Sequence, residues 1–331
     1  MKLGKDYLTH PRGSSSRSEE SRRRRRVSEA VGSVAGMRYG FIFTGSDPEV
    51  AVELAPLAEA SGWDAFFVWE GIWATDPWAV LAACAVVTDR IRLGTMLTPV
   101  PRRRPWELAG QTMTVDRLSN GRVILSAGLG VPEDVEERFW IFEPDPGRRV
   151  RAELLDEGLE LMQHLWQGEP FSYEGEHFHA KRTETMLPPA IVQQPRIPTW
   201  VVGVWPRMRS MRRVARYDGW IPNYAPPEAA GVDPVEQQRT FTPEIAAEAI
   251  TWIRAERERL GLADRPFDVV QEGTTSGVDP VADAARVRPW AEAGATWWLE
   301  SDWQVPAERV ADSARDRLRA GPPRVEGPAL G

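Results

Sequence analysis

From Met37 onward, short apolar runs rich in β-branched and aromatic residues alternate with longer segments whose apolar positions recur at helical spacing. The alternation occurs eight times, which is the pattern of βα units around a parallel sheet. Eight such units in about 280 residues predict a (β/α)₈ barrel, with a doubly wound open sheet as the alternative. The predicted strands are Arg38–Phe43, Ala65–Trp69, Ile91–Leu97, Arg122–Ala127, Thr199–Val204, Trp220–Asn223, Phe267–Glu272 and Thr296–Glu300.

The ends of two helices are marked by residues that favour helix boundaries. Asp47 followed by Pro48 predicts the start of the first helix, since an aspartate caps free N–H groups and proline fits the first turn. Gly62 ends that helix. The fourth helix is predicted over Arg148–Gln167, with Gly168 as its stop.

Two insertions interrupt the regular alternation, one after the fourth helix and one after the sixth strand. Glu169–Pro198 contains the alternating stretch Phe171–Phe178, which predicts a β-hairpin, whereas Tyr224–Thr242 is rich in Pro and Ala and is expected to be a mobile loop. Each insertion is open to two interpretations, a lid over the catalytic face or a passive connection.

The ends of the chain differ from the barrel segment, residues 37–320. Residues 1–36 are polar and include the run Arg22–Arg26, so a disordered tail or a translated leader is expected there. Residues 321–331 are expected to form a flexible C-terminus. The start has no apolar core of a signal peptide and no apolar run reaches about 18 residues, so we expect a cytoplasmic protein without a membrane partner.

Charge and residue usage narrow the possible chemistry. A net charge of −7 argues against nucleic acid as the main partner. Cys84 is the only cysteine, and a single cysteine excludes both a disulfide framework and a cysteine metal site. Cys84 itself is expected to be a buried helix residue. Neither HExxH, GxSxG nor GxxxxGK[ST] occurs, and His and Lys are scarce. An enzyme with these residues is expected to rely on a bound cofactor.

Several segments, in their order along the chain, resemble the bacterial-luciferase-like family of flavin-dependent oxidoreductases. The resemblance covers about Met37 to Asp302. It is carried by Thr88–Pro99, Arg104–Ala109, Asp116–Arg122, Gly128–Gly130, Tyr173–Phe178, Gln194–Pro198 and Ala215–Trp220. It implies a flavin ring at the carboxyl ends of the strands, a phosphate held by loops, and a substrate in front of the ring.

The resemblance also implies residues that contact the flavin ring. The end of the third strand, Thr95, Met96 and Leu97, is expected to support it, with a non-prolyl cis bond at Met96–Leu97 rather than an ordinary trans one. Gly128 and Gly130 would let the backbone approach the cofactor closely, although a plain turn explains them too. A dinucleotide-binding interpretation of these glycines is weak, because the third glycine is missing.

The cofactor phosphate is expected at the helix that follows the fifth strand. Gly203, Val204, Arg207, Met208 and Arg209 lie there, and a helix N-terminus with nearby guanidinium groups binds phosphate. A solvated basic helix start is the alternative. Some related enzymes place an arginine just after the fourth strand, where this chain has Leu129, so the departure shifts the phosphate contacts to Arg207 and Arg209.

Two residues are the expected proton carriers. Glu70 follows the second strand where related deazaflavin-dependent dehydrogenases have an acid followed by histidine, but here Gly71 replaces the histidine. Glu70 could be a general acid or base, or a salt-bridged structural residue. His177 is the second catalytic candidate, with His179 beside it, although hairpin histidines are commonly surface residues.

Aromatic and basic residues suggest the nature of the substrate. Fifteen tryptophans are many for this length, and those after the second and fifth strands, Trp69, Trp73, Trp78 and Trp205, are expected to line the mouth of the pocket. An apolar or aromatic substrate follows as a hypothesis. The loop Arg102–Arg104 either attracts an anionic part of cofactor or substrate, or is simply solvated.

We therefore expect a monooxygenase that uses reduced flavin mononucleotide (FMN), O₂ and a small-molecule substrate, with a flavin reductase as the source of reduced flavin. The first alternative is a hydride-transferring dehydrogenase or reductase with a deazaflavin coenzyme. The second is a barrel that binds flavin without turnover. Family members commonly pair, so a homodimer is expected.

Overall fold

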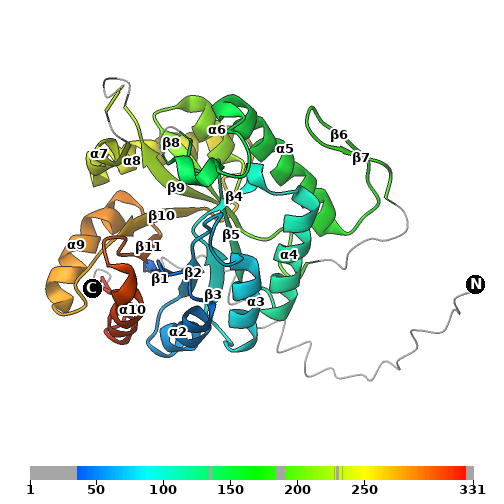
Figure 1. The fold of residues 1–331 in the computed structure, drawn as a ribbon. Coiled ribbons are helices and arrows are strands. Elements are labelled where there is room, and N and C mark those ends of the chain that lie inside the picture. The colour runs from blue at the N-terminus through cyan, green and yellow to red at the C-terminus, as the bar shows by residue number, and fades with distance from the viewer. Residues whose placement is uncertain are drawn as a thin grey trace, which may run out of the picture. The chain divides into compact units, whose positions relative to one another are not determined.

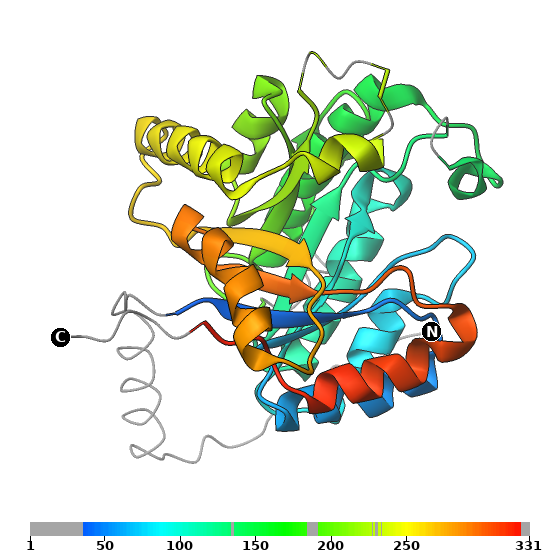
Figure 2. The ribbon, with the colours of Figure 1, turned by 90° about the vertical axis from the view of Figure 1, so that its left-hand side faces the viewer.

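Eight parallel strands form a closed barrel in the computed structural model, which describes residues 36–133, 136–183, 191–226, 228, 231–232 and 234–325 (Figure 1). Strand β1 pairs with both β2 and β11, and β3 pairs with β5, so the sheet closes on itself. Figure 2 shows β1 beside β11. The predicted (β/α)₈ barrel is confirmed. The strands are β1 (Arg38–Phe43), β2 (Ala65–Val68), β3 (Arg92–Thr95), β5 (Val123–Gly128), β8 (Thr199–Trp205), β9 (Gly219–Tyr224), β10 (Asp268–Gly273) and β11 (Trp297–Glu300).

A helix follows each barrel strand and covers the outside of the barrel. Asp47 accepts hydrogen bonds from the N–H groups of Glu49 and Val50, so the predicted start of α2 is confirmed. Helix α5 ends at Gly168 with φ 68°, as predicted. These helices are α2 (Pro48–Ala60), α3 (Pro77–Val86), α4 (Pro105–Leu118), α5 (Gly147–Gln167), α6 (Met208–Ala215), α8 (Pro243–Arg259), α9 (Pro280–Ala293) and α10 (Val310–Arg319).

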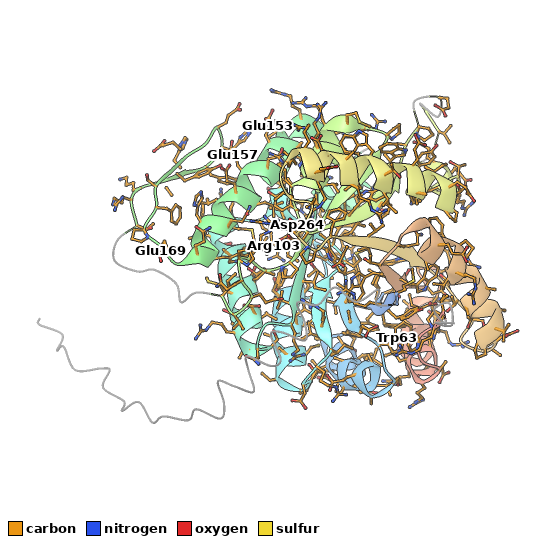
Figure 3. All side chains as sticks on the ribbon, turned by 180° about the vertical axis from the view of Figure 1, so that it is seen from behind. Trp63, Arg103, Glu153, Glu157, Glu169 and Asp264 are labelled. Carbon is orange, nitrogen blue, oxygen red and sulfur yellow. The ribbon has the colours of Figure 1, made fainter. Side chains whose placement is uncertain are left out.

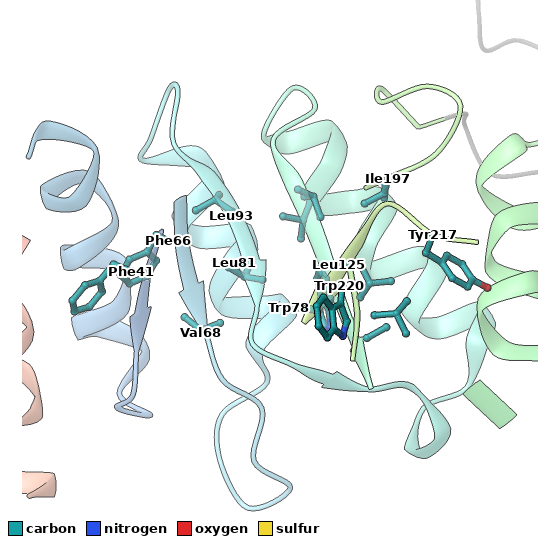
Figure 4. Packing of buried hydrophobic residues seen from close by; sticks show 14 of the residues in the cluster. Phe41, Phe66, Val68, Trp78, Leu81, Leu93, Leu125, Ile197, Tyr217 and Trp220 are labelled. Atoms are coloured by element: carbon teal, nitrogen blue, oxygen red, sulfur yellow. The ribbon is translucent and has the colours of Figure 1, made fainter. Parts of the chain in front are cut away.

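Alternate residues of the strands build two separate apolar layers. The inner layer fills the barrel and includes Phe67, Met96 and Trp200. The outer layer joins strands to helices. Figure 4 shows part of it, with the rings of Phe41 and Phe66 stacked at a centroid distance of 6.4 Å. This alternation decides which side chains at the ends of the strands can face the barrel mouth.

The two insertions take different forms. The first contains the predicted hairpin, β6 (Tyr173–Glu174) paired antiparallel with β7 (His179–Ala180). The second, expected to be a loop, contains the short helix α7 (Pro234–Arg239). A further difference lies at the third strand, which is predicted to reach Leu97. It ends at Thr95, and a two-residue strand, β4 (Thr98–Pro99), pairs instead with β5.

The described residues end within the predicted C-terminal segment. The N–H of Val325 donates to the hydroxyl of Tyr39, so residues up to 325 contact the barrel. The predictions for residues 1–35 and 326–331 lie outside the described part. Buried Cys84 on α3 agrees with the sequence. In the described part, none of the helices combines the length and apolar character needed to cross a membrane.

Candidate active site at the barrel mouth

The carboxyl ends of the eight strands meet at one rim of the barrel, because the strands are parallel. The loops after β2, β5, β8 and β11 all leave from this rim, which we call the mouth. Most of the site residues predicted from the sequence belong to these loops or to the strand ends beside them. The mouth is therefore where their side chains can act together.

Glu70 follows β2 and is almost fully buried, with 9% of its side chain exposed. One carboxylate oxygen, Oε1, accepts a hydrogen bond from Nε of Arg103 at 2.8 Å. The other, Oε2, is buried and has no hydrogen-bond partner among the described residues. Burial raises the pKa of Glu70, while the positive charge and hydrogen bond of Arg103 oppose that rise. Glu70 is thus both ion-paired and able to hold a proton on its second oxygen.

Arg103 connects Glu70 to the neighbouring loops. Its guanidinium also donates to Asp76, which caps α3, and to Gln111 on α4, each at 3.2 Å. A planar guanidinium with several acceptors holds the Glu70 carboxylate in one orientation. Figure 3 labels Arg103 toward the middle of the view.

The residues predicted to support a flavin ring form a compact segment after β3. The Met96–Leu97 peptide bond is cis, as the sequence analysis expects. Met96 belongs to the inner apolar layer, and Thr95 is fully buried, with its hydroxyl accepting a hydrogen bond from Thr98 at 2.9 Å. A Cβ at Gly128 would lie 2.9 Å from Cδ1 of Leu97, so only glycine lets Leu97 pack there.

Gly130 has a left-handed conformation with φ 78°, which favours glycine. Buried Arg151 of α5 fixes this turn, since its guanidinium donates to the carbonyl of Gly130 at 3.0 Å and pairs with Asp145 at 3.0 Å. The loop after β5 is therefore tied to the start of α5. This tie places the N-terminus of α5 at the mouth.

At the end of β8, the predicted cofactor residues divide into two groups. A Cβ at Gly203 would lie 2.4 Å from Cγ2 of Val214 on α6, so Gly203 faces the outer layer, and Met208 packs against that layer too. Val204 alternates with Gly203, and its N–H donates to Ser210 of α6 at 3.0 Å. Packing against the outer layer therefore explains why Gly203 and Met208 occupy these positions.

Positive charge gathers where the N-termini of α5 and α6 meet. Arg207 caps α6, and the side chains of Arg207 and Arg209 are both exposed. Partial burial and the positive charges of Arg207 and Arg151 lower the pKa of Arg148, in the first turn of α5. Like charges placed together in this way are typical of a site that binds an anion. Arg148 could not be identified from the sequence, although the barrel topology brings the starts of both helices to the same rim.

His177 lies apart from Glu70, on the hairpin that packs against α5. Its Nε2 is 3.2 Å from a carboxylate oxygen of Glu153. Figure 3 labels Glu153 and Glu157 on α5. The other described histidines also belong to this region, since His164 stacks on Phe171 and exposed His179 contacts Glu174. Of the two interpretations of His177, a catalytic residue or a surface residue of the hairpin, these contacts favour the second.

Aromatic side chains of three loops form a row along the mouth, Trp303–Trp69–Trp73–Phe139, which we call the aromatic row. Ring centroids are 6.4 Å apart for Trp69 and Trp303, 6.3 Å for Trp69 and Trp73, and 4.8 Å for Trp73 and Phe139. The predictions for Trp78 and Trp205 are wrong. Trp78 is buried on α3, within the outer apolar layer. Strand β8 runs one residue further than predicted, so Trp205 points outward and packs on Trp252 of α8 at 6.3 Å.

Trp69 also occupies the space beside Gly71. A Cβ at residue 71 would lie 2.5 Å from Cζ3 of the Trp69 ring, closer than two carbon atoms can approach. A histidine at this position would require Trp69 to move. The mouth is therefore aromatic at the place where a histidine follows the acid in the related deazaflavin enzymes.

Comparison with curated proteins gives relatives of moderate similarity. A Mycobacterium tuberculosis protein, provisionally named a coenzyme F420-dependent oxidoreductase, is 29% identical over 210 residues, which is 60% of this chain and 58% of that protein. The F420-dependent glucose-6-phosphate dehydrogenase of Segniliparus rotundus is 34% identical over 141 residues, 40% of this chain and 42% of the enzyme. The chain thus matches only part of these two relatives, 58% and 42% of their lengths.

Solved structures share the fold at lower identity. The monooxygenase RslO1 from Streptomyces bottropensis superposes with a TM-score of 0.66 at 18% identity, over 86% of this chain and 98% of that structure. The family described as luciferase-like monooxygenase matches residues 34–321. The resemblance seen in the sequence is confirmed, and the chain belongs to this luciferase-like family of oxidoreductases.

Proposed function

We propose that the chain is a monooxygenase that binds reduced FMN at the barrel mouth and oxidises an apolar or aromatic substrate with O₂. The observation that carries the cofactor part is the placement of Arg148 in the first turn of α5 and of Arg207 at the N-cap of α6, close enough for their positive charges to act on each other. A phosphate placed there would neutralise two guanidinium groups and accept from free N–H groups at the start of α6. Arg209 would add a third positive charge.

The residues at the mouth fit the remaining parts of such a cofactor. Met96 and Leu97 would support the ring, and Gly128 and Gly130 would let it approach the backbone. The bound flavin would supply two electrons, so that one oxygen atom enters the substrate and the other leaves as water. Glu70 would hold a proton on its buried Oε2, and the aromatic row would limit the access of water.

Gly71 favours oxygenation over dehydrogenation of an alcohol. The Trp69 ring fills the space that a side chain at residue 71 needs, and the described histidines belong to α5 and the hairpin. Among the described residues, a dehydrogenase at this mouth would have carboxylates such as Glu70 and Glu272, but no histidine, as proton acceptors. An oxygenase needs no histidine there, provided that the site is apolar.

A deazaflavin-dependent oxidoreductase is the second candidate, because relatives matched over part of this chain carry F420-dependent names. The phosphate site proposed above would serve either cofactor. A separate flavin reductase as electron source and a homodimer stay predictions.

The phosphate site is tested by removing charge from α6. Anaerobic titration of the double variant Arg207→Gln, Arg209→Gln with reduced FMN should show at least about a tenfold loss of affinity. Arg212→Gln removes an exposed arginine from the same helix and should leave the affinity unchanged. Equal affinity of the double variant and the wild type would disprove the site.

Cofactor choice is tested by titrating the wild type with reduced FMN and with the deazaflavin coenzyme. Preference for FMN, with substrate-dependent oxygen consumption, supports the oxygenase. Preference for the deazaflavin moves the enzyme to hydride transfer. Flavin binding without turnover of any aromatic substrate would support a non-catalytic barrel instead.

A further inference from the structure

Arg102 is a partly buried cation at the mouth, and the described residues offer its guanidinium no hydrogen-bond acceptor. It ends the 3₁₀ turn Val100–Arg102 that follows β4. Its Nε is buried without a partner, and its guanidinium carbon lies 5.8 Å from the ring centre of Phe139 and 6.0 Å from that of Trp140. A buried N–H group without an acceptor is costly, so the Nε of Arg102 is suited to receive an acceptor from a ligand.

The neighbouring charges do not supply that acceptor. Glu70, an acidic group close enough to act on Arg102, already binds Arg103. Burial lowers the pKa of Arg102. The negative charges of Glu70 and Glu143 oppose this shift, but neither group contributes to it through a hydrogen bond. A ligand carboxylate beside Arg102 would therefore gain both charge pairing and hydrogen bonds.

Phe139 joins Arg102 to the aromatic row. Its ring lies 4.8 Å from that of Trp73 on one side and 5.8 Å from the guanidinium on the other. Trp73 and Trp303 remain 42% and 48% exposed, which leaves apolar ring surface for a ligand to cover. The mouth thus presents aromatic surface with one cation at its end.

We propose that the substrate is an aromatic carboxylate, whose ring packs on the aromatic row and whose carboxylate pairs with Arg102. The proposal deepens the proposed function and rests on it. A guanidinium binds a carboxylate with two parallel hydrogen bonds, which would fix the orientation of the ring. An anionic group of the cofactor shares this chemistry, so the test must separate the two sources.

The test compares acids with their amides, which have the same shape but no charge. The full-length protein, loaded with oxidised FMN, is titrated with 2-naphthoate and indole-3-acetate and with the two matching carboxamides, followed by flavin absorbance. Each titration is repeated with Arg102→Gln, and with Arg104→Gln as control. Arg104 belongs to the same loop, but its side chain is exposed and lies over Trp106 on α4.

In the wild type and in Arg104→Gln, at least one acid should bind about tenfold more tightly than its amide, a preference that Arg102→Gln should abolish. Equal binding of acid and amide, binding of neither acid, or a preference kept in Arg102→Gln would overturn the proposal. So would weaker FMN binding by Arg102→Gln, since Arg102 would then hold the cofactor. Failure of the wild type to bind FMN at all would instead reject the proposed function.

Discussion

Glu70 combines two properties that normally exclude each other in a carboxylate, an ion pair with Arg103 and a raised pKa. Burial dominates, because the cost of desolvating the buried carboxylate outweighs the charge and hydrogen bond of Arg103. Burial penalises the charged form, and the penalty is absent while the group is protonated. The contribution of Glu70 to the free energy of unfolding is therefore fully present below the pKa of the unfolded state, about 4.3. It is lost as pH rises through the raised pKa of the folded state.

We expect Glu70→Gln to gain stability relative to the wild type as pH rises over this range, because glutamine carries no charge. Urea unfolding at several pH values measures the difference. Glu53→Gln is the control with the opposite sign, because the hydrogen bond from Arg315 lowers the pKa of Glu53. That contribution is present above the unfolded pKa and is lost as pH falls. Identical pH dependence of Glu70→Gln and wild type would show that burial does not govern Glu70.

Individual residues also show where sequence reasoning reached its limit. Glu70 and the Met96–Leu97 bond could be identified from motifs, because the chemistry is local in the chain. Trp205 was misplaced, because one more residue in β8 reverses the face of a side chain. Arg148 and the pairing of Glu70 with Arg103 depend on segments that are distant in the sequence and that only the pairing of neighbouring strands brings together.

At the scale of elements, one helical carboxylate anchors the hairpin β6–β7. Glu157 of α5 accepts hydrogen bonds from the backbone N–H groups of Glu176, His177 and Phe178 at 2.8–3.1 Å. Burial alone would raise the pKa of Glu157, but these N–H groups together outweigh it and lower the pKa. The alternating pattern predicted the hairpin, but nothing in it indicated which helix would hold the turn.

Glu157→Ala should free the hairpin without unfolding the barrel. We expect faster hydrogen exchange at the amides of residues 173–180, since three bonded N–H groups lose their acceptor, and little change elsewhere. Glu160→Ala is the matched control on the same helix, because Glu160 accepts a hydrogen bond from the hydroxyl of Tyr173, at 3.1 Å, and from none of the described N–H groups of the hairpin. Unchanged exchange in Glu157→Ala would mean that apolar contacts such as Phe178 with Trp106 hold the hairpin.

At the scale of the whole molecule, one end of the barrel contributes to stability, and the other end, the mouth, carries the proposed flavin site. Asp268, at the first residue of β10, pairs with Arg38 of β1 and accepts from the ring N–H of Trp200 at 3.0 Å. These contacts join three strands at the end opposite the mouth. The eight strands could be predicted from the sequence, because each has its own apolar run. The polar contacts of Asp268 that join β1, β8 and β10 could not.

Asp268→Ala should lower the free energy of unfolding by about 1–3 kcal/mol, because it removes an acceptor shared by several partly buried donors. The affinity for FMN should not change, since the mouth is at the other end. Urea unfolding and flavin titration measure the two properties. Asp312→Ala, which breaks only an exposed pair with Arg315, should have little effect on either. A loss of flavin affinity in Asp268→Ala would contradict the separation of the two ends.

Flavin binding at the mouth is tested most directly by an anaerobic titration of the full-length protein with reduced FMN and with reduced riboflavin, followed by tryptophan fluorescence. The two ligands share the ring and differ in the phosphate. We expect both to quench the tryptophans of the aromatic row, and FMN to bind at least about tenfold more tightly. Equal affinity for the two ligands would contradict the phosphate site, and binding of neither would contradict a flavin at the mouth.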